Sequence, residues 1–174
     1  MEGFLYNSAS CLFCHACELA CQEAHELTPG HYYRRVERLP DGEGNYVLFS
    51  GSCNHCERPV CVEVCRSRAM LRQDDGIVVH DDGACIGCGA CYWSCPYGAV
   101  TFVPSEGIAG KCDSCVTLRE KGQSPICVQA CPVHALQWGE LPAERESSPY
   151  LPDPGRTLPR LSLSAEREAQ NERG

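Results

Sequence analysis

Residues 85–96, with the sequence CIGCGACYWSCP, place four cysteines close together and end on a proline. Cys85, Cys88 and Cys91 follow one another at intervals of three positions, and Cys95 comes four positions later. Three thiolates at such spacing suit three corners of one small inorganic cube. In the pattern C-x₂-C-x₂-C-x₃-C-P, the fourth cysteine ligates a second, neighbouring iron–sulfur cluster. The stretch therefore predicts cluster ligands that are divided between two sites.

The same grouping recurs along the chain, because its sixteen cysteines fall into four blocks of four. In every block the first two cysteines are three positions apart and the last two are four apart, while the middle gap varies. Thiols at i and i+4 lie one helical turn apart on one face, so they are displaced along the helix axis and can serve different sites. This internal repeat predicts four [4Fe–4S] clusters. The blocks are Cys11, Cys14, Cys17 and Cys21; Cys53, Cys56, Cys61 and Cys65; Cys85, Cys88, Cys91 and Cys95; and Cys112, Cys115, Cys127 and Cys131.

Disulfides and zinc are the other common uses of so many cysteines. A disulfide framework also gives an even number, but pairs at i, i+3 and i, i+4 have poor disulfide geometry. No basic segment followed by an apolar one precedes Cys11, so we expect no secretory signal peptide. Zinc competes better, because two C-x₂-C pairs can form a Cys₄ site. A zinc-stapled interaction module is therefore the alternative outside redox chemistry.

Composition limits the remaining classes of function. A formal net charge of −8 argues against a nucleic-acid surface. Cysteine makes up about 9% of the 174 residues, and the other core-forming residues are few, so something besides side-chain packing should fill the interior. No apolar stretch is long enough for a transmembrane helix, so we expect no direct membrane insertion. We expect a soluble or peripherally membrane-associated subunit, either cytoplasmic or exported with a partner.

Short strands and hairpins are expected between the blocks. The pattern predicts strands at 4–6, 99–103 and 135–138, a helix at 17–26, and hairpins of 32–38 with 46–49 and of 69–71 with 77–79. Strand, cysteine loop, short helix and strand is the order of a ferredoxin half-unit, so the chain is predicted to be α+β with two ferredoxin-like modules. Spacing alone does not decide which blocks pair, and side-by-side and nested pairing both remain open.

Polar residues near the blocks each have two interpretations. His55, inside block two, either hydrogen-bonds a cluster sulfur and raises its potential or is an ordinary polar loop residue. Arg34, Arg35 and Arg38 form either a docking patch or the solvated face of a hairpin.

The sequence from about Leu141 onward is rich in proline, serine and charge and contains no cysteine. This composition predicts either a disordered tail or an extended arm that lies along a partner. Apolar residues at 150–151 and 158–163 favour the arm.

The motifs resemble those of the four-cluster iron–sulfur subunit of anaerobic dimethyl sulfoxide reductase and its molybdoenzyme relatives. The resemblance covers nearly the whole chain. One departure is Arg66, which follows Cys65 where the family usually has proline. The similar stretches are SCNHC at 52–56, CVEVC at 61–65, CIGCG at 85–89, CPYGA at 95–99, KCDSC at 111–115, CVQACP at 127–132 and LPDP at 151–154.

What the resemblance implies is a nested pairing, with an inner module inside an outer one. Residues 1–52 would be the first half of the outer module plus a hairpin, 53–104 the inner module, 105–140 the second half of the outer module, and 141–174 an extended tail or partner-docking arm. The implied ligands are Cys11, Cys14, Cys17 and Cys131 for cluster 1; Cys21, Cys112, Cys115 and Cys127 for cluster 2; Cys53, Cys56, Cys61 and Cys95 for cluster 3; and Cys65, Cys85, Cys88 and Cys91 for cluster 4.

The function implied by the resemblance is electron transfer, without catalysis by the chain itself. Such a subunit passes electrons between a molybdopterin-containing catalytic subunit and a quinol-oxidising membrane anchor. Electron-wire subunits of formate dehydrogenase and hydrogenase complexes share the same cysteine pattern, and they are the alternative within redox chemistry.

Overall fold

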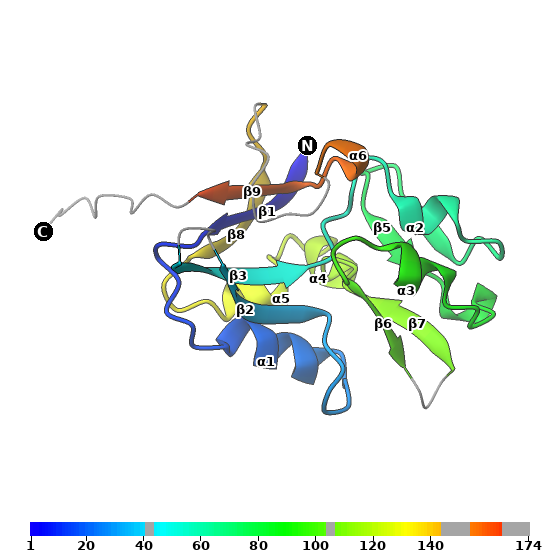
Figure 1. Ribbon diagram of the computed structural model, residues 1–174, viewed down its shortest axis with the longest axis horizontal. Coiled ribbons are helices and arrows are strands. Elements are labelled where there is room, and N and C mark those ends of the chain that lie inside the picture. Colours follow the sequence, from blue (N-terminus) through cyan, green and yellow to red (C-terminus); the bar gives the residue numbers. More distant parts are fainter. Residues whose placement is uncertain (41–43, 104–106, 144–153, 165–174) are drawn as a thin grey trace, which may run out of the picture.

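The computed structural model describes residues 1–40, 44–103, 107–143 and 154–164. Short helices and small sheets are joined by the cysteine loops (Figure 1), which confirms the expected α+β class. Within these ranges, no helix is long and apolar enough to span a bilayer. The strands are β1 (Glu2–Asn7), β2 (Arg34–Pro40), β3 (Tyr46–Ser52), β4 (Met70–Arg72), β5 (Val78–His80), β6 (Val100–Val103), β7 (Ile108–Lys111), β8 (Leu136–Glu140) and β9 (Leu161–Ser164). The helices are α1 (Ala16–Ala24), α2 (Val60–Glu63), α3 (Ala90–Ser94), α4 (Val116–Arg119), α5 (Ile126–Gln129) and α6 (Pro154–Thr157), with a 3₁₀ turn η1 (Asp82–Ala84).

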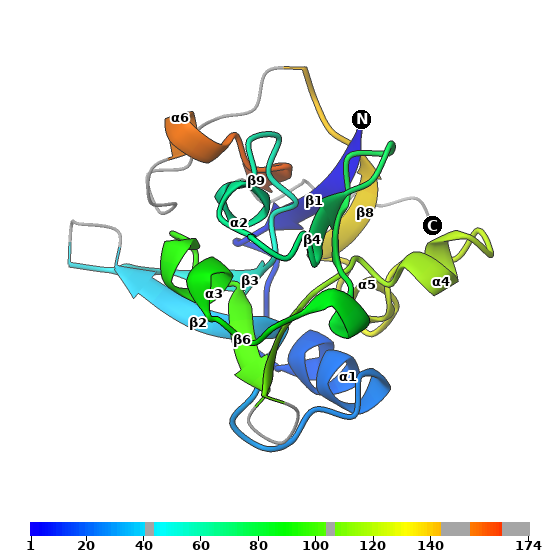
Figure 2. The ribbon, with the colours of Figure 1, turned by 90° about the vertical axis from the view of Figure 1, so that its right-hand side faces the viewer.

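One three-stranded sheet joins the two ends of the chain. Strand β1 lies at its centre, antiparallel to β8 and parallel to β9. Glu2 is opposite Glu140, and Phe4 is opposite Leu161 on the other side. Because the first strand pairs with the last two, the segment that leads into block one lies beside the segment that leaves block four (Figure 2).

The middle of the chain forms the other part of the molecule. The elements α2, α3, β6 and β7 gather on the right in Figure 1, while β1, β8, α1 and α5 lie on the left. Helix α1 contacts α5, and α2 contacts α3. A helix of the first block is therefore packed against a helix of the fourth, and a helix of the second block against one of the third.

The remaining strands form antiparallel hairpins. Strands β2 and β3 pair with Arg34 opposite Ser52, and β4 and β5 pair with Met70 opposite His80. These two hairpins confirm the sequence prediction, apart from residues 41–43, which lie outside the described ranges. A third hairpin, β6 with β7, was only half expected, because strand β7 was not predicted from the sequence.

The helices that carry the last two cysteines of each block are shorter than expected. Only α1 contains both members of its pair, whereas α2, α3 and α5 end before the fourth cysteine. A proline follows Cys95 and Cys131, and the residue before a proline is disfavoured in the helical region. Helix α2 ends equally early although Arg66 stands in place of the proline, so the early end does not depend on that residue.

The buried core is small and contains cysteines at its centre. Apolar side chains surround the sulfurs, where a larger protein would place more hydrocarbon. One cluster of buried residues joins Phe4, Tyr6, Ala135, Leu136 and Leu161 to Cys53, Cys112 and Cys127, and the other joins Met70, Val100 and Ala109 to Cys91.

The described part of the tail, residues 154–164, lies along the chain's own block-two loop. The N–H groups of Glu57 and Arg58 donate to the carbonyls of Leu158 at 2.9 Å and Thr157 at 3.0 Å. The N–H of Arg160 donates to the carbonyl of Asn54 at 2.8 Å. The tail therefore bridges the outer sheet and the inner part of the molecule. Contact between the tail and a partner stays a prediction, and residues 150–151 lie outside the described ranges.

Candidate metal centres

All sixteen cysteines lie within the described residues as free thiols, so no disulfide competes for their sulfurs. Most are at least partly shielded from solvent, and only two, Cys14 and Cys88, are exposed. The five fully buried thiols are Cys21, Cys53, Cys91, Cys112 and Cys127. Free buried thiols are the form in which cysteine ligates a metal centre.

Three thiols of blocks one and four surround Tyr6, a buried residue of β1. Burial raises the pKa of Tyr6 most strongly, followed by a hydrogen bond with Cys11 and by the charges of Cys11, Cys17 and Cys131. Burial also raises the pKa of Cys17, and Cys131 adds to that rise. Cys14 comes from the same loop as Cys11 and is exposed. The fold thus brings the last cysteine of block four to block one.

A second group joins the last cysteine of block one to the rest of block four. Burial raises the pKa of Cys112, and the strongest charge that adds to this rise is that of Cys21, followed by Cys127. Burial likewise raises the pKa of Cys21 to about 12, with contributions from Cys127 and Cys115. These four thiols therefore lie within electrostatic range of one another.

A third group of thiols lines a single cavity. Cys53, Cys56 and Cys61 of block two and Cys95 of block three form its wall together with apolar side chains and the buried Lys111. Burial raises the pKa of Cys56 to about 12, and the charges of Cys53, Cys61 and Cys95 add to it. Burial raises the pKa of Cys61 to about 12 as well, with contributions from Cys53 and Cys95. The cavity therefore brings together four cysteines of two blocks in largely apolar surroundings.

The fourth group combines block three with the last cysteine of block two. Burial raises the pKa of Cys91, and the charges of Cys65 and Cys85 contribute to the rise. Burial acts in the same direction on Cys65, but hydrogen bonds, including one from the N–H of Met70 at 3.3 Å, lower its pKa overall. Cys88 belongs to the same loop as Cys85 and is exposed.

Electrostatic interactions between cysteines of different groups connect the four groups in a linear order. Each pair consists of one cysteine from each of two successive groups. The pairs are Cys17 with Cys127, Cys112 with Cys53, and Cys61 with Cys91.

The groups fit soft, highly charged metal centres. Sets of sulfur donors select iron–sulfur clusters or zinc. Burial raises the pKa of several of these thiols, among them Cys21, Cys56, Cys61 and Cys112, and a bound centre would supply the positive charge that lets four thiolates share one site. The cavity between Cys53, Cys56, Cys61 and Cys95 supports this fit directly.

Comparison with known proteins decides between the two kinds of centre. Residues 45–141 match the family model described as a 4Fe-4S dicluster domain. Over 150 residues the sequence is 42% identical to the B subunit of anaerobic dimethyl sulfoxide reductase from Escherichia coli strain K12, covering 80% of this chain and 73% of that protein. The protein belongs to the 4Fe-4S dicluster family. The expected resemblance is confirmed, and the cofactors of this dicluster protein are [4Fe–4S] clusters.

Two further relatives are named as subunits of reductases. The probable anaerobic dimethyl sulfoxide reductase subunit YnfG of Escherichia coli strain K12 is 40% identical over 155 residues, which are 83% of this chain and 76% of the relative. The thiosulfate reductase electron transfer subunit PhsB of Salmonella typhi is 37% identical over 143 residues, which are 79% of this chain and 74% of the relative.

The cysteine loops repeat one backbone conformation in all four blocks. In each block the residue two positions after the first cysteine has a positive φ, and these residues are Phe13 (55°), His55 (42°), Gly87 (66°) and Ser114 (60°). The turn directs the N–H of Phe13 to the sulfur of Cys11 at 3.4 Å and the N–H of Ser114 to that of Cys112 at 3.3 Å. Block one lies outside the match at 45–141, and its loop nevertheless has the same conformation.

Replacing Gly87 by alanine is expected to destabilise the cluster-loaded protein more than the same change at Gly98. Both residues have positive φ, but a Cβ at Gly87 would lie 2.2 Å from the carbonyl oxygen of Gly107, whereas nothing lies within 4 Å at Gly98. We expect a loss of about 2–4 kcal/mol at Gly87, from strain plus overpacking, and about 1–2 kcal/mol at Gly98, from strain alone. Chemical denaturation followed by cluster absorbance measures both, and equal losses would show that the close approach is not rigid.

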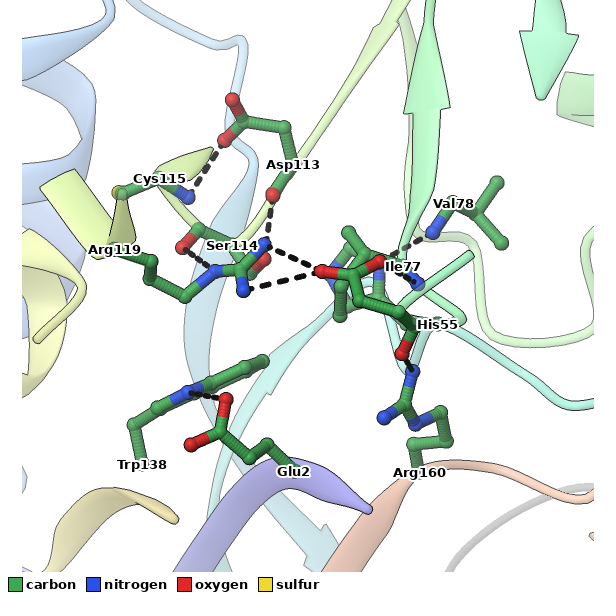
Figure 3. Close-up of polar contacts among 11 residues, drawn as sticks. Glu2, His55, Ile77, Val78, Asp113, Ser114, Cys115, Arg119, Trp138 and Arg160 are labelled. Atoms are coloured by element: carbon green, nitrogen blue, oxygen red, sulfur yellow. Dashed lines mark hydrogen bonds and ion pairs between the residues drawn. The ribbon is translucent and has the colours of Figure 1, made fainter. Parts of the chain in front are cut away.

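Polar contacts tie the block-four loop to the β4–β5 turn (Figure 3). Arg119 donates to the carbonyl of Ser114 at 3.2 Å and forms an ion pair with Asp75 at 3.3 Å. Arg160 of the tail donates to the carbonyl of Asp75 at 2.9 Å. Because Asp75 belongs to the inner part of the molecule and Ser114 to the outer part, these bonds fix the two parts relative to each other.

His55 is a buried bridge to β5, not an ordinary polar loop residue. Its Nδ1 accepts the N–H of Val78 at 3.2 Å (Figure 3). The same nitrogen lies 3.9 Å from the sulfur of Cys53. Burial, then the charges of Lys111, Arg160 and Arg119, hold the pKa of His55 well below its usual range. The ring is therefore neutral, with its proton on Nε2. A hydrogen bond from His55 to a cluster sulfur stays a prediction.

The arginines of the β2–β3 hairpin do not share one face. Arg35 and Arg38 are exposed, as expected, whereas Arg34 is 2% exposed and points into the core. The two predictions for Arg34, a docking patch and a solvated face, are both wrong. Strand residues alternate between faces, so Arg34 shares its inward side with Val36.

Proposed function

We propose that the chain is an electron-transfer subunit with four [4Fe–4S] clusters that relays electrons to or from a molybdopterin-containing catalytic subunit of a dimethyl sulfoxide reductase-type complex. The chain itself would not be catalytic. The observation that carries the proposal is the linear order of four thiol groups, each joined to the next through a pair of neighbouring cysteines. The names of the relatives, which include an electron transfer subunit, support it.

Each cluster would take three thiolates from one block and one from its partner block. The electrostatic neighbours described above support this division, and the cavity supports it for cluster 3. We propose Cys11, Cys14, Cys17 and Cys131 for cluster 1; Cys21, Cys112, Cys115 and Cys127 for cluster 2; Cys53, Cys56, Cys61 and Cys95 for cluster 3; and Cys65, Cys85, Cys88 and Cys91 for cluster 4.

The proposed division of the chain follows the same nesting. Residues 53–104 would form the inner module, and residues 1–52 and 105–140 the two halves of the outer module. The contacts of α1 with α5 and of α2 with α3 support these boundaries. Residues 141–174 would be an arm, and a docking role for this arm rests on the resemblance alone.

When bound, the clusters supply one-electron redox chemistry that the side chains lack. The chain holds and spaces the sulfurs, and its buried core excludes water from them. Backbone N–H groups of Phe13, Met70 and Ser114 donate to sulfurs, which stabilises negative charge on the thiolates. The bonds between Arg119, Asp75 and Ser114 keep the distance between the outer and inner groups fixed.

Identifying the partner subunit distinguishes the proposed complex from a formate dehydrogenase or hydrogenase complex. We expect the tagged chain, purified without oxygen from its own host, to bring down a molybdopterin subunit, with molybdenum and about sixteen irons per chain. A membrane anchor would appear in the same preparation as an additional subunit. Recovery of a hydrogenase without molybdenum would reject the dimethyl sulfoxide reductase-type assignment, and stoichiometric zinc without iron would reject the electron-transfer function.

A further inference from the structure

Arg34 is a buried cation whose charge faces thiols. Its guanidinium donates to the carbonyl and hydroxyl oxygens of Ser50 at 2.9 and 3.0 Å and to the hydroxyl of Ser52 at 2.9 Å. It stacks over the ring of Phe4 at 4.5 Å from the ring centroid. Its Nε is buried and has no hydrogen-bond partner in the described part of the chain. The serines therefore satisfy part of the guanidinium, but they carry no negative charge.

No carboxylate of the described residues forms an ion pair with Arg34. The charged groups that act on it most are the thiols of Cys127, Cys112, Cys17 and Cys21. One of these belongs to the proposed cluster 1 and three to cluster 2, so the charge of Arg34 acts on ligands of both outer clusters. An unpaired buried charge costs several kcal/mol, and ligand thiolates are the anions that offset this cost here.

Lys111 is a second buried cation near thiols, and it lies at the third thiol group. It is buried at the end of β7, and its ammonium group donates to the carbonyl oxygens of Val78 and of Cys112, the latter at 2.8 Å. It lines the cavity of the third thiol group and acts electrostatically on Cys61. No carboxylate ion pair to Lys111 is present among the described residues either.

We propose that Arg34 and Lys111 are built-in counter-cations that raise the reduction potentials of the clusters, Arg34 for the two outer clusters and Lys111 for the cluster in the cavity. This inference rests on the proposed function. Each reduction adds one electron to a cluster and no proton to either residue, so the buried negative charge grows by one. A fixed nearby cation stabilises the reduced form more than the oxidised form, and the low-dielectric surroundings strengthen the effect.

The test is a titration of the loaded protein with dithionite and redox mediators, followed by electron paramagnetic resonance. Arg34→Gln should increase the ratio of oxidised to reduced outer cluster at least tenfold at a fixed solution potential, which is a fall of about 59 mV or more for one electron. Arg34→Lys, which keeps the charge, should retain potentials close to the native ones. Arg35→Gln removes an exposed charge from the neighbouring position and should change nothing.

Lys111→Gln and Lys111→Arg form an independent pair that reports on a different cluster. Lys111→Gln should lower the reduction potential of the cluster in the cavity, cluster 3, and leave the potentials of the two outer clusters near their native values. Unchanged potentials in both glutamine variants with full iron content would overturn the proposal, and so would an Arg34→Lys variant that shifts as far as Arg34→Gln. If neither Arg34 variant loads iron, the Lys111 pair decides alone. Wild-type protein without about sixteen irons would instead overturn the proposed function.

Discussion

Replacing Cys11 and Cys131 together is expected to remove no more iron than replacing Cys11 alone. The two residues are far apart in the sequence, yet both act on Tyr6 and are proposed ligands of cluster 1. If the loss of one ligand already removes the cluster, the loss of a second ligand of the same cluster removes no further iron. Alanine is the substitution to use, because serine oxygen can itself ligate iron. We expect each single variant and the double variant to lose about four irons per chain.

The matched control is a double variant of Cys11 and Cys65. In the nested arrangement these residues serve different clusters, so we expect a loss of about eight irons. If block one instead paired side by side with block two, the outcomes would exchange places. Cys11→Ala with Cys65→Ala would then remove one cluster, and Cys11→Ala with Cys131→Ala would remove two. Iron and acid-labile sulfide analysis of the anaerobic variants distinguishes the two patterns.

Removing the iron is expected to unfold the chain or leave it molten. Both clusters of buried residues contain thiols, and among the fully buried residues that the structure describes, the second joins Met70, Val100 and Ala109 to Cys91. Without iron, no metal centre holds the four thiols of each site together. Metal ligation supplies folding free energy on the order of 10 kcal/mol per structural site in small metal-binding domains, which is as large as the whole stability of a typical domain.

This expectation is tested by near-ultraviolet circular dichroism and chemical denaturation after an oxidant and a chelator have extracted the iron. The control is the same protein with the chelator alone under anaerobic conditions, where the clusters stay intact. We expect the extracted protein to lose its near-ultraviolet signal and its cooperative transition. A native-like signal with a cooperative transition would mean that side-chain packing suffices to hold the fold.

Local sequence chemistry was enough to predict much of the fold. The hairpin of β4 and β5 has a turn rich in aspartate and glycine between two short apolar strands, and it formed as predicted. Strand β9 was missed, because its partner β1 lies at the other end of the chain and no local pattern encodes a parallel pairing at that separation. The repeated positive φ was not predicted, since Phe13, His55 and Ser114 carry no local signature of that conformation.

The sequence predicted the cysteines as candidate ligands, but it did not predict their surroundings. The spacing of the cysteines indicated iron–sulfur clusters, because ligand geometry is imposed within each block. The burial of Arg34 was not predictable, since the thiols that face it come from blocks one and four and meet only in the folded chain. An arginine on a hairpin normally indicates a solvated face, and only the tertiary arrangement reverses that interpretation.

The most direct test of the proposed arrangement is the electron paramagnetic resonance spectrum of the anaerobic protein after full reduction with dithionite. Clusters held as close neighbours in a line should give about four unpaired spins per chain, with signals broadened by magnetic interaction between adjacent clusters. A silent spectrum, or narrow signals that add up as isolated clusters, would contradict the linear arrangement.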